Sequence, residues 1–351
     1  MIDFSDVKLG KLVIHKVGNK MRDEGFTLSK SNLELEDDVM KELLLKYFLL
    51  PFKGKTFYKF HHETDIFLNE VYTYSTKIFS DASNFYDESI KILKHLYNQS
   101  THPNIKIGEF YMVYFQDCII DNIKTSAIGI FKSENKDIYL KISESTDMFN
   151  IKHEKGINIK RLDKGCLIFN IDSEEGYRVN IVDNSNNEAL FWKDAFLNLK
   201  ILENEYHHTE TYLKICSEFC DNVYAPVYNA SKKDIVQLKK KAIEYFAENT
   251  SLDTQKFTTE VLEDIQCIEH FQEFKKSYEI TNNIMPIEDF QISNEAVKKV
   301  KRKFKSIIKL DDNFQIKINN QVESEKKSLI EKGYDEQKGM SFYKVYFVSE
   351  E

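Results

Sequence analysis

Three β-rich runs in the middle of the chain decide its fold: Glu109–Ile120 (EFYMVYFQDCII), Thr125–Lys132 (TSAIGIFK) and Ile138–Ile142 (IYLKI). Aromatic and β-branched residues fill these runs and polar residues separate them, a pattern typical of strands joined by turns. A further pair, Gly165–Asp172 and Tyr177–Val182, flanks a polar turn and predicts another pair of strands. We therefore expect mainly antiparallel strands in this part of the chain.

Helical patterns lie on both sides of these runs, so we predict an α+β fold of mixed helices and mainly antiparallel strands. Before the runs we expect a strand at Leu12–Val17 and helices at Val39–Leu50, Ile66–Phe79 and Ser83–Asn98. After them we expect helices at Tyr206–Cys220, Ser231–Asn249, Thr254–Ile265, Ile268–Tyr278 and Ser293–Phe304, a hairpin of Ser306–Leu310 with Phe314–Ile318, and a strand at Phe342–Val348.

A chain of 351 residues fits two domains. The segment Asp221–Ala230 contains Pro226 and two Asn, and we place the boundary there, between an N-terminal α+β domain (1–225) and a C-terminal α+β domain with basic helices (230–351). Ser231 and Asp234 form a capping-box pattern that starts the second part. Residues 1–230 carry a net charge of −7 and residues 231–351 carry −1.

Composition excludes several classes of protein. With 49 basic and 57 acidic residues, the net charge of −8 excludes a uniformly basic DNA coat, although binding follows local potential. With 11 Gly and 4 Pro, collagen and flexible linkers are excluded, and neither a Walker loop nor Gly-x-Gly-x-x-Gly occurs. Only four basic residues are Arg, so lysines that grip phosphates are more plausible than bidentate readers of guanine.

The five Cys are scattered and odd in number, which fits reduced thiols in a cytoplasmic protein. The N-terminus shows no basic-then-apolar signal pattern, and no apolar run approaches 18 residues. We therefore expect no membrane span.

The strongest charge cluster lies within the predicted helix Ser293–Phe304 and just beyond it. Six basic residues and no acidic one occur in eight positions: Lys298, Lys299, Lys301, Arg302, Lys303 and Lys305. Val297, Val300 and Phe304 follow helical spacing, so they would bury while the basic side chains spread outward. Such a helix could lie along a phosphate backbone and release counterions. The alternative is an ordinary solvated helix face.

A second cluster of basic residues opens the helix Ser231–Asn249. On a helical wheel Lys232, Lys233, Lys239 and Lys240 fall within a sector of roughly 120°. Val236 and Ile243 intrude on this sector, so part of it is also expected to pack. A solvated amphipathic helix explains this cluster alone, but two clusters in one region favour a shared basic surface.

Two kinds of catalytic or metal site are weaker hypotheses. Asp117 or Asp121, with Glu134 and Lys136, loosely imitates a Mg²⁺-dependent nuclease, in which carboxylates hold the metal and a Lys supports the attacking water. Glu134 and Lys136, however, fall in a predicted turn rather than on a rigid element.

Glu205 and His208 have the spacing of half a di-iron motif, and Cys216 and Cys220 share a helix face. Neither set has the second half that would complete a site. We therefore expect no metal and no cofactor.

Several strings together resemble the bacterial nucleoid-associated protein family of the NdpA type. They cover most of the chain: Ile14–Val17 (IHKV), Lys59–His61 (KFH), Ala127–Lys136 (AIGIFKSENK), Gly156–Asn170 (GINIKRLDKGCLIFN) and Glu188–Leu197 (EALFWKDAFL). The resemblance implies a protein of the bacterial cytoplasm and nucleoid that is associated with DNA binding. It brings no catalytic residue with it. The matching strings look structural, and Trp192 is expected in the core.

We therefore expect a non-enzymatic protein that binds DNA with little sequence preference, mainly through phosphate contacts. Charge alone assigns the contacts to Lys298, Lys299, Lys301, Arg302, Lys303 and Lys305, supported by Lys232, Lys233, Lys239 and Lys240. Nucleoid proteins and a second copy of the chain are further candidate partners. The alternative is an interaction protein recruited to the nucleoid through an apolar face of the N-terminal domain.

Overall fold

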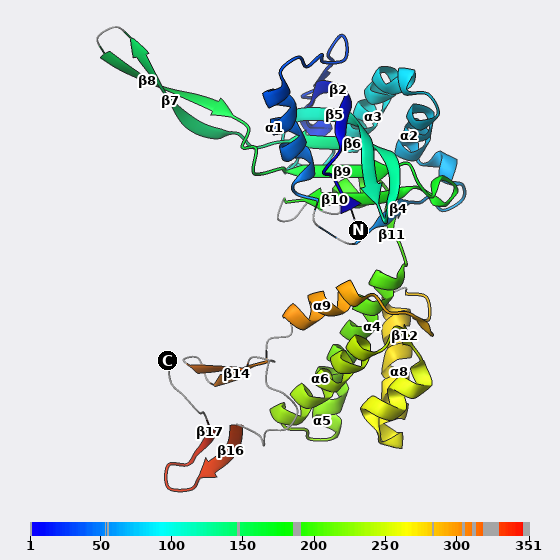
Figure 1. Ribbon diagram of the computed structural model, residues 1–351, viewed down its shortest axis with the longest axis vertical. Coiled ribbons are helices and arrows are strands. Elements are labelled where there is room, and N and C mark those ends of the chain that lie inside the picture. Colours follow the sequence, from blue (N-terminus) through cyan, green and yellow to red (C-terminus); the bar gives the residue numbers. More distant parts are fainter. Residues whose placement is uncertain are drawn as a thin grey trace. The chain divides into compact units, whose positions relative to one another are not determined.

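A computed structural model describes residues 2–52, 54, 56–145, 148–184, 191–282, 284–303, 306–310, 314–318 and 330–346. Contacts divide the chain into unit 1, Met1–Asn204, and unit 2, Glu205–Glu351 (Figure 1). Helices and antiparallel strands occur in both units, so the predicted α+β class is confirmed.

Unit 1 is built on a single antiparallel sheet. Its strands run in the order β11-β4-β10-β9-β6-β5-β2-β3, and β1 pairs with β5 beside β2. The strands of this sheet are β1 (Ile2–Asp3), β2 (Lys8–Val17), β3 (Phe26–Thr27), β4 (Tyr58–Phe60), β5 (Gly108–Ile120), β6 (Ile123–Ser133), β9 (Lys164–Phe169), β10 (Arg178–Asp183) and β11 (Leu199–Ile201).

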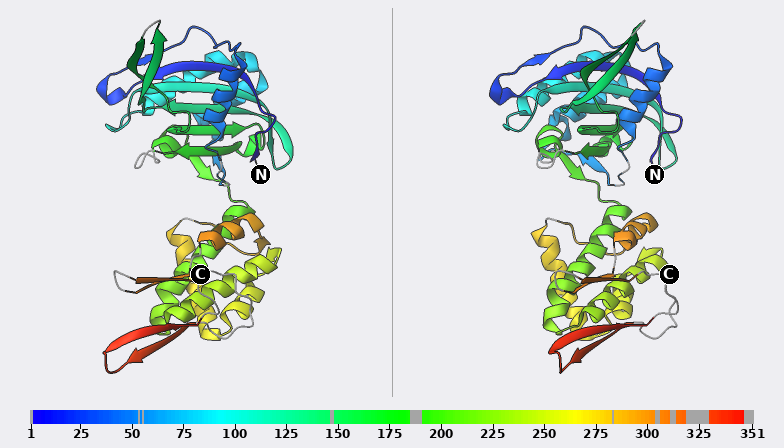
Figure 2. Two further views of the ribbon diagram at one scale, coloured as in Figure 1. Left: turned by 60° about the vertical axis from the view of Figure 1, so that its left-hand side comes forward. Right: turned by 90° about the vertical axis from the view of Figure 1, so that its left-hand side faces the viewer.

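The run that decides the fold, β5, is buried on both faces of this sheet. Phe110 and Met112 point into one core, and Tyr111 and Val113 point into the other. Because both faces of this strand are covered, its sequence does not alternate between polar and apolar residues, and the run is almost continuously apolar. Figure 2 shows helices on both sides of the sheet.

Three helices cover the sheet: α1 (Asp38–Leu49), α2 (Glu70–Ser80) and α3 (Phe85–Gln99). The two helices α2 and α3 share one core with the sheet, and α1 belongs to the other. On the α1 side, the Phe48 ring stacks on that of Phe131 at 4.4 Å between centroids. On the α2–α3 side, Trp192 is fully buried as predicted. The predicted strand Leu12–Val17 and the predicted helices Val39–Leu50 and Ser83–Asn98 are confirmed, whereas Ile66–Phe79 is divided at Asn69 into a 3-10 turn (Ile66–Leu68) and α2.

Five strands of unit 1 were not predicted, namely the short strands β1, β3, β4 and β11 and the nine-residue strand β8. Met148–Gly156 forms β8 and pairs with β7 (Asp137–Ser145) as a separate two-stranded ribbon. This β7–β8 arm projects from the body of unit 1 (Figure 1). Its second strand carries Asn, Lys, His and Glu among the apolar residues, so the sequence has a weak strand signal, and pairing with β7 decides its conformation.

Unit 2 is mainly helical. Its helices are α4 (Glu205–Phe219), α5 (Ala225–Val227), α6 (Lys232–Glu248), α7 (Thr254–Phe257), α8 (Ile265–Thr281) and α9 (Asn294–Lys303). Tyr212 of α4 lies at the centre of an aromatic core, with ring centroids 5.3 Å from Phe257 and 5.6 Å from Phe246. Among the described residues, no helix is long and apolar enough to cross a membrane.

Short antiparallel pairs complete unit 2. They are β12 (Ser251–Leu252) with β13 (Phe290–Gln291), β14 (Ser306–Leu310) with β15 (Phe314–Ile318), and β16 (Ile330–Asp335) with β17 (Met340–Val345). The predicted hairpin β14–β15 is confirmed. Parts of other predictions lie outside the described residues, namely Phe304, Asp311–Asn313, Glu188–Leu190 and the last two residues of Phe342–Val348.

The division between the units falls before α4, whereas the sequence suggested a boundary at Asp221–Ala230. That segment is helical here, with π-type turns at Cys220–Tyr224 followed by α5. Because α4 brings acidic residues into unit 2, the two units carry equal charge. Unit 1 has 27 basic and 31 acidic residues, and unit 2 has 22 and 26, so each is −4. A basic surface in unit 2 is therefore local.

Candidate nucleic-acid interface

The basic helix α9 is anchored by small apolar side chains. Ala296 and Val297 are buried, and the helix packs against α4 and α6. Lys298 and Arg302 lie opposite this buried face and Lys301 lies at its edge, and all three are exposed to solvent. Among the residues that the structure describes, these three have no ion-pair partner. Within the described ranges, three cations of α9 are thus exposed and unpaired.

Lys299 has a different environment on the same helix. Its ammonium lies 2.7 Å from Glu210 of α4 and 5.3 Å from the centre of the Tyr206 ring. Burial alone would lower the pKa of Lys299, but the hydrogen bonds to Glu210 and Tyr206 outweigh it, so the pKa is raised. Lys299 is therefore charged at neutral pH, and its charge already serves to hold α9 on α4.

The side chain of Lys303 and the whole of Lys305 lie outside the described residues. Of the six basic residues predicted on this helix, the structure therefore presents three as outward cations and one as a packing contact.

The helix α6 begins as predicted. The Ser231 side chain accepts a hydrogen bond from the backbone of Asp234, whose carboxylate accepts one from the backbone N–H of Ser231. Lys232 and Lys233 are exposed in the first turn. The capping box thus fixes where these two side chains leave the helix.

The later lysines of α6 are engaged in ion pairs. Lys239 lies 2.5 Å from Asp221, and its side chain is only 14% exposed. Lys240 lies 3.3 Å from Glu244 in an exposed pair one turn along the helix. Exposed pairs of this kind contribute little to stability and can exchange partners. Lys240 thus remains accessible to a ligand, whereas Lys239 is held inward.

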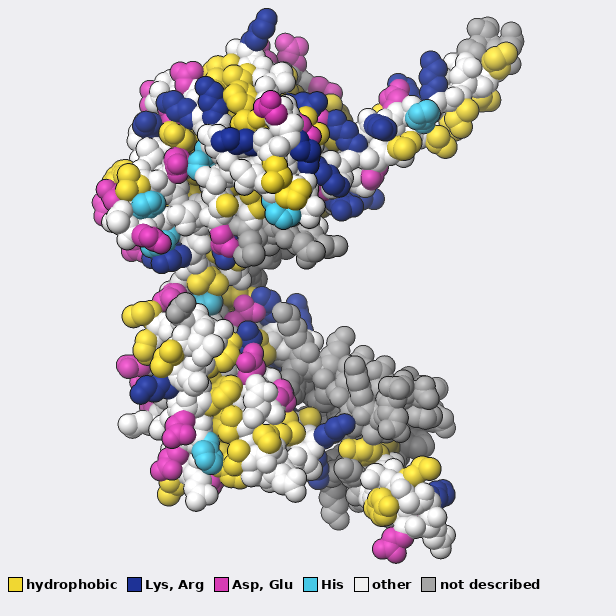
Figure 3. Space-filling view, turned by 180° about the vertical axis from the view of Figure 1, so that it is seen from behind, with side chains coloured by type: hydrophobic (Ala, Val, Ile, Leu, Met, Phe, Trp, Pro, Cys, Tyr) yellow, Lys and Arg dark blue, Asp and Glu magenta, His cyan; other side chains and the backbone are white. Residues whose placement is uncertain are grey.

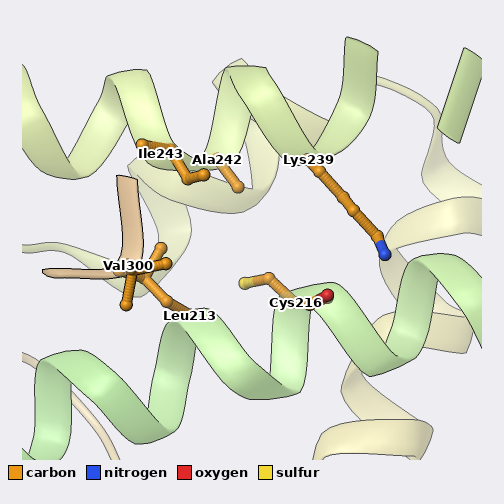
Figure 4. Close-up of a pocket in the computed structure, with 7 residues that line it drawn as sticks. Leu213, Cys216, Lys239, Ala242, Ile243 and Val300 are labelled. Carbon is orange, nitrogen blue, oxygen red and sulfur yellow. The ribbon is translucent and has the colours of Figure 1, made fainter. Parts of the chain in front are cut away.

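A groove of about 200 Å³ lies between α4, α6 and α9 (Figure 4). Ile243 of α6, Val300 of α9 and Leu213 of α4 line it, and Lys239 lies farther along α6. Val300 of α9 and Ile243 of α6 thus face the same groove. On α6, Lys232 and Lys233 lie about 11 Å from Lys240 along the helix axis, given a rise of about 1.5 Å per residue.

The residues of the nuclease hypothesis are not brought together. Asp121 is at one end of β6 and bonds Arg178 at 2.6 Å, whereas Glu134 follows the other end. The length of that strand separates them by roughly 30 Å. Lys136 pairs with Glu109 at 2.5 Å, and Asp117 pairs with Lys8 and Lys124. Carboxylates so far apart cannot share a metal ion, so this hypothesis is wrong in its geometry.

Glu134 instead belongs to a buried ionic cluster that sequence reasoning missed. Its carboxylate lies 2.6 Å from the ammonium of Lys132, and both side chains are almost fully buried. Asp163 accepts hydrogen bonds from the backbone N–H groups of Glu134 and Asn135, at 2.7 and 2.9 Å. The strings KSEN and RLDKG, which carry much of the family resemblance, build this cluster.

The other candidate ligands are also accounted for by packing. His208 of α4 packs edge-on against Phe290. Burial raises the pKa of Cys220 to about 12 and also raises that of Cys216, so both are buried thiols without reactivity at neutral pH. Within the described ranges, no three His, Cys, Asp or Glu side chains are placed to hold a metal ion.

A family model described as "Nucleoid-associated protein YejK" matches residues 13–338 of the chain. The matched range includes all of the strings quoted above and most of each structural unit. No curated protein matches the chain.

Proposed function

Because the chain belongs to the family of nucleoid-associated proteins described as YejK, we propose that it binds DNA directly and with little sequence preference. The observation that supports this most is the outer face of α9. Lys298, Lys301 and Arg302 are exposed there without an ion-pair partner among the described residues.

Unpaired cations are the groups that gain most from a phosphate. A lysine that already has a carboxylate partner must give it up on binding, whereas an unpaired one only releases phosphate counterions. No acidic residue occurs between Ala296 and Lys305, so no carboxylate in this stretch repels the DNA backbone. We therefore assign the principal contacts to Lys298, Lys301 and Arg302.

Other predicted residues have supporting or structural roles. Lys240 and Lys233 lie on α6 with exposed side chains and extend the surface. Lys299 and Lys239 are paired with Glu210 and Asp221, so we assign them to holding the helices together. A surface dominated by Lys binds phosphates as point charges and reads no base edges, which gives binding with little sequence preference.

The test is a titration of two duplexes of unrelated sequence, followed by fluorescence anisotropy at several salt concentrations. With three to five phosphate contacts, the slope of log K against log salt should be about −3 to −4.5. The double variant Lys301→Glu with Arg302→Glu should weaken binding to both duplexes alike, by about 100-fold at low salt.

The matched control is Lys256→Glu with Lys276→Glu, which changes the charge of unit 2 by the same amount on α7 and α8. Equal weakening by both double variants would show that net charge matters and not this surface. If association with the nucleoid survives the α9 reversal while direct binding is absent in wild type, recruitment by a protein partner replaces our proposal.

A further inference from the structure

The β7–β8 arm has two chemically different faces. Directly opposed residues of an antiparallel pair share a face, so Leu140 with His153 and Ile142 with Ile151 lie on one side. Ile138 and Phe149 extend this apolar face toward the base and the tip. The other face is polar: Tyr139 donates a hydrogen bond to Glu154 at 2.8 Å, and Lys141 lies 3.4 Å from the same carboxylate.

The apolar face is almost uncovered in the single chain. Ile138, Leu140, Ile142, Phe149 and Ile151 have 65–73% of their surface exposed. Figure 3 shows a row of hydrophobic side chains along one side of the arm. Contiguous exposed apolar surface of this kind marks an interaction site on a soluble protein.

The charge of the arm argues against DNA as the occupant. Residues 137–156 contain three Lys and four Asp or Glu, so the arm is slightly acidic. Lipid is disfavoured because a two-stranded ribbon would bring the unpaired backbone groups of its edges into hydrocarbon. A protein surface that is itself apolar with matched charges is the better fit.

We propose that this face binds the same face of a second copy of the chain, with the two arms antiparallel. The arrangement is isologous, so each residue is used twice. With the two-fold axis at Ile142 and Ile151, these residues meet their own copies at the centre. The tip of each arm then lies over the base of the other, and the bodies of the two chains lie at opposite ends.

The polar side chains of the face fit this arrangement. Glu144 lies toward the tip, whereas His153 and Lys155 lie toward the base. In the antiparallel pair, Glu144 of one copy lies over Leu140 of the second copy. It is then also close to His153 of the second copy, which is paired with that Leu140. A parallel pair would instead place the two Glu144 carboxylates side by side and the two bodies at the same end.

The size of the face predicts the strength of the association. Nine residues per strand span about 30 Å, and two strands are about 10 Å wide. One face of each arm therefore has an area on the order of 300 Å². Two such faces bury less than a standard interface of about 1,200 Å² or more. The dimer should therefore be weak and visible at micromolar concentrations or above.

The test is sedimentation velocity of the full chain, without DNA, from about 1 to 500 μM. Wild type should show a reversible monomer–dimer equilibrium. Ile151→Lys should raise the dimer dissociation constant at least about tenfold, because a buried ammonium at the two-fold axis faces its own copy. Asn150→Lys, the neighbouring residue on the polar face, is the matched control and should leave the constant unchanged.

The register is tested by a charge exchange. Glu144→Lys and His153→Glu should each weaken the dimer severalfold, and the double variant should restore it. A wild-type chain that stays monomeric at all concentrations overturns the proposal, as does a dimer insensitive to Ile151→Lys. Failure of the double variant to recover overturns the antiparallel arrangement. None of these outcomes depends on DNA binding, so the proposal stands or falls separately from the proposed function.

Discussion

Lysines at one end of the unit 1 sheet and lysines on α9 have opposite environments. Lys132 and Lys164 are opposite each other on β6 and β9, and both side chains are fully buried. Glu134 lies 2.6 Å from the first, and Asp183 lies 3.2 Å from the second. On α9, Lys298 and Lys301 are exposed and have no ion-pair partner among the described residues.

The comparison shows that the number of lysines in a segment does not predict whether they stabilise the fold or bind a ligand. A buried ammonium is tolerable only with a carboxylate beside it, so such a pair is part of the fold. An exposed, unpaired ammonium contributes little to folding and is available to a phosphate. Stability should therefore respond to lysine substitution in unit 1, and DNA affinity should respond on α9.

The largest expected effect is on the buried pair. Lys132→Met leaves the carboxylate of Glu134 buried without a cation, which should lower the free energy of unfolding of unit 1 by about 3–5 kcal/mol. Urea denaturation followed by fluorescence of Trp192, the single Trp and fully buried in unit 1, measures it. Lys298→Met is the control and should not move the transition. A loss below about 1 kcal/mol for Lys132→Met would contradict the assignment.

The next effect is a pH dependence carried by a buried histidine in unit 1. Burial lowers the pKa of His15 to about 4, and its Nδ1 accepts a hydrogen bond from the backbone of Ser29. Because the folded pKa is below the unfolded one, the contribution to stability is complete above pH 6.5. It is lost as the pH falls from there toward 4, by roughly 2 kcal/mol between pH 7 and pH 5.

His15→Gln should remove that part of the pH dependence in the same fluorescence assay. Because other groups titrate in this range, the difference between wild type and variant is the quantity of interest. An identical pH profile for the two proteins would show that the imidazole is not held neutral.

A smaller effect is expected at the start of α6. Ser231→Ala removes the capping box and should lower the stability of unit 2 by about 1 kcal/mol, as monitored by circular dichroism. Ser231→Asn should keep most of it, because Asn is an equally good cap. Lys233→Ala, in the same turn, should leave stability unchanged and reduce DNA affinity. The opposite pattern would reverse the roles assigned to the two residues.

The smallest effect separates two lysines of α9. Lys301→Ala should make the salt slope of DNA binding shallower by about 0.9, the loss of one phosphate contact. Lys299→Ala should change it less, since Glu210 already neutralises this ammonium. Anisotropy titrations of both variants over a range of salt concentrations measure the difference. Equal slopes would show that ion pairing in the free protein does not decide which lysines bind.

Local patterns predicted the elements that local forces determine. The apolar run of β5, the helices α1 to α3 and the Ser231–Asp234 cap were all predicted, because spacing and capping act within a few residues. The strand β8 was missed because its conformation depends on pairing with β7. The contacts divide the chain before α4, because the Tyr212 ring of α4 packs against Phe246 of α6 and Phe271 of α8, which lie far along the chain.

The sequence by itself determined the α+β class, the family and the presence of two basic helices. Only the tertiary structure decided which of the described lysines are paired with a carboxylate. Lys299 pairs with Glu210 and Lys239 with Asp221, partners far away along the chain. The cluster around Lys132 and Asp163 likewise joins separate strands. Charge pairing acts through space over a few ångströms, and a helical wheel shows only the neighbours within one helix.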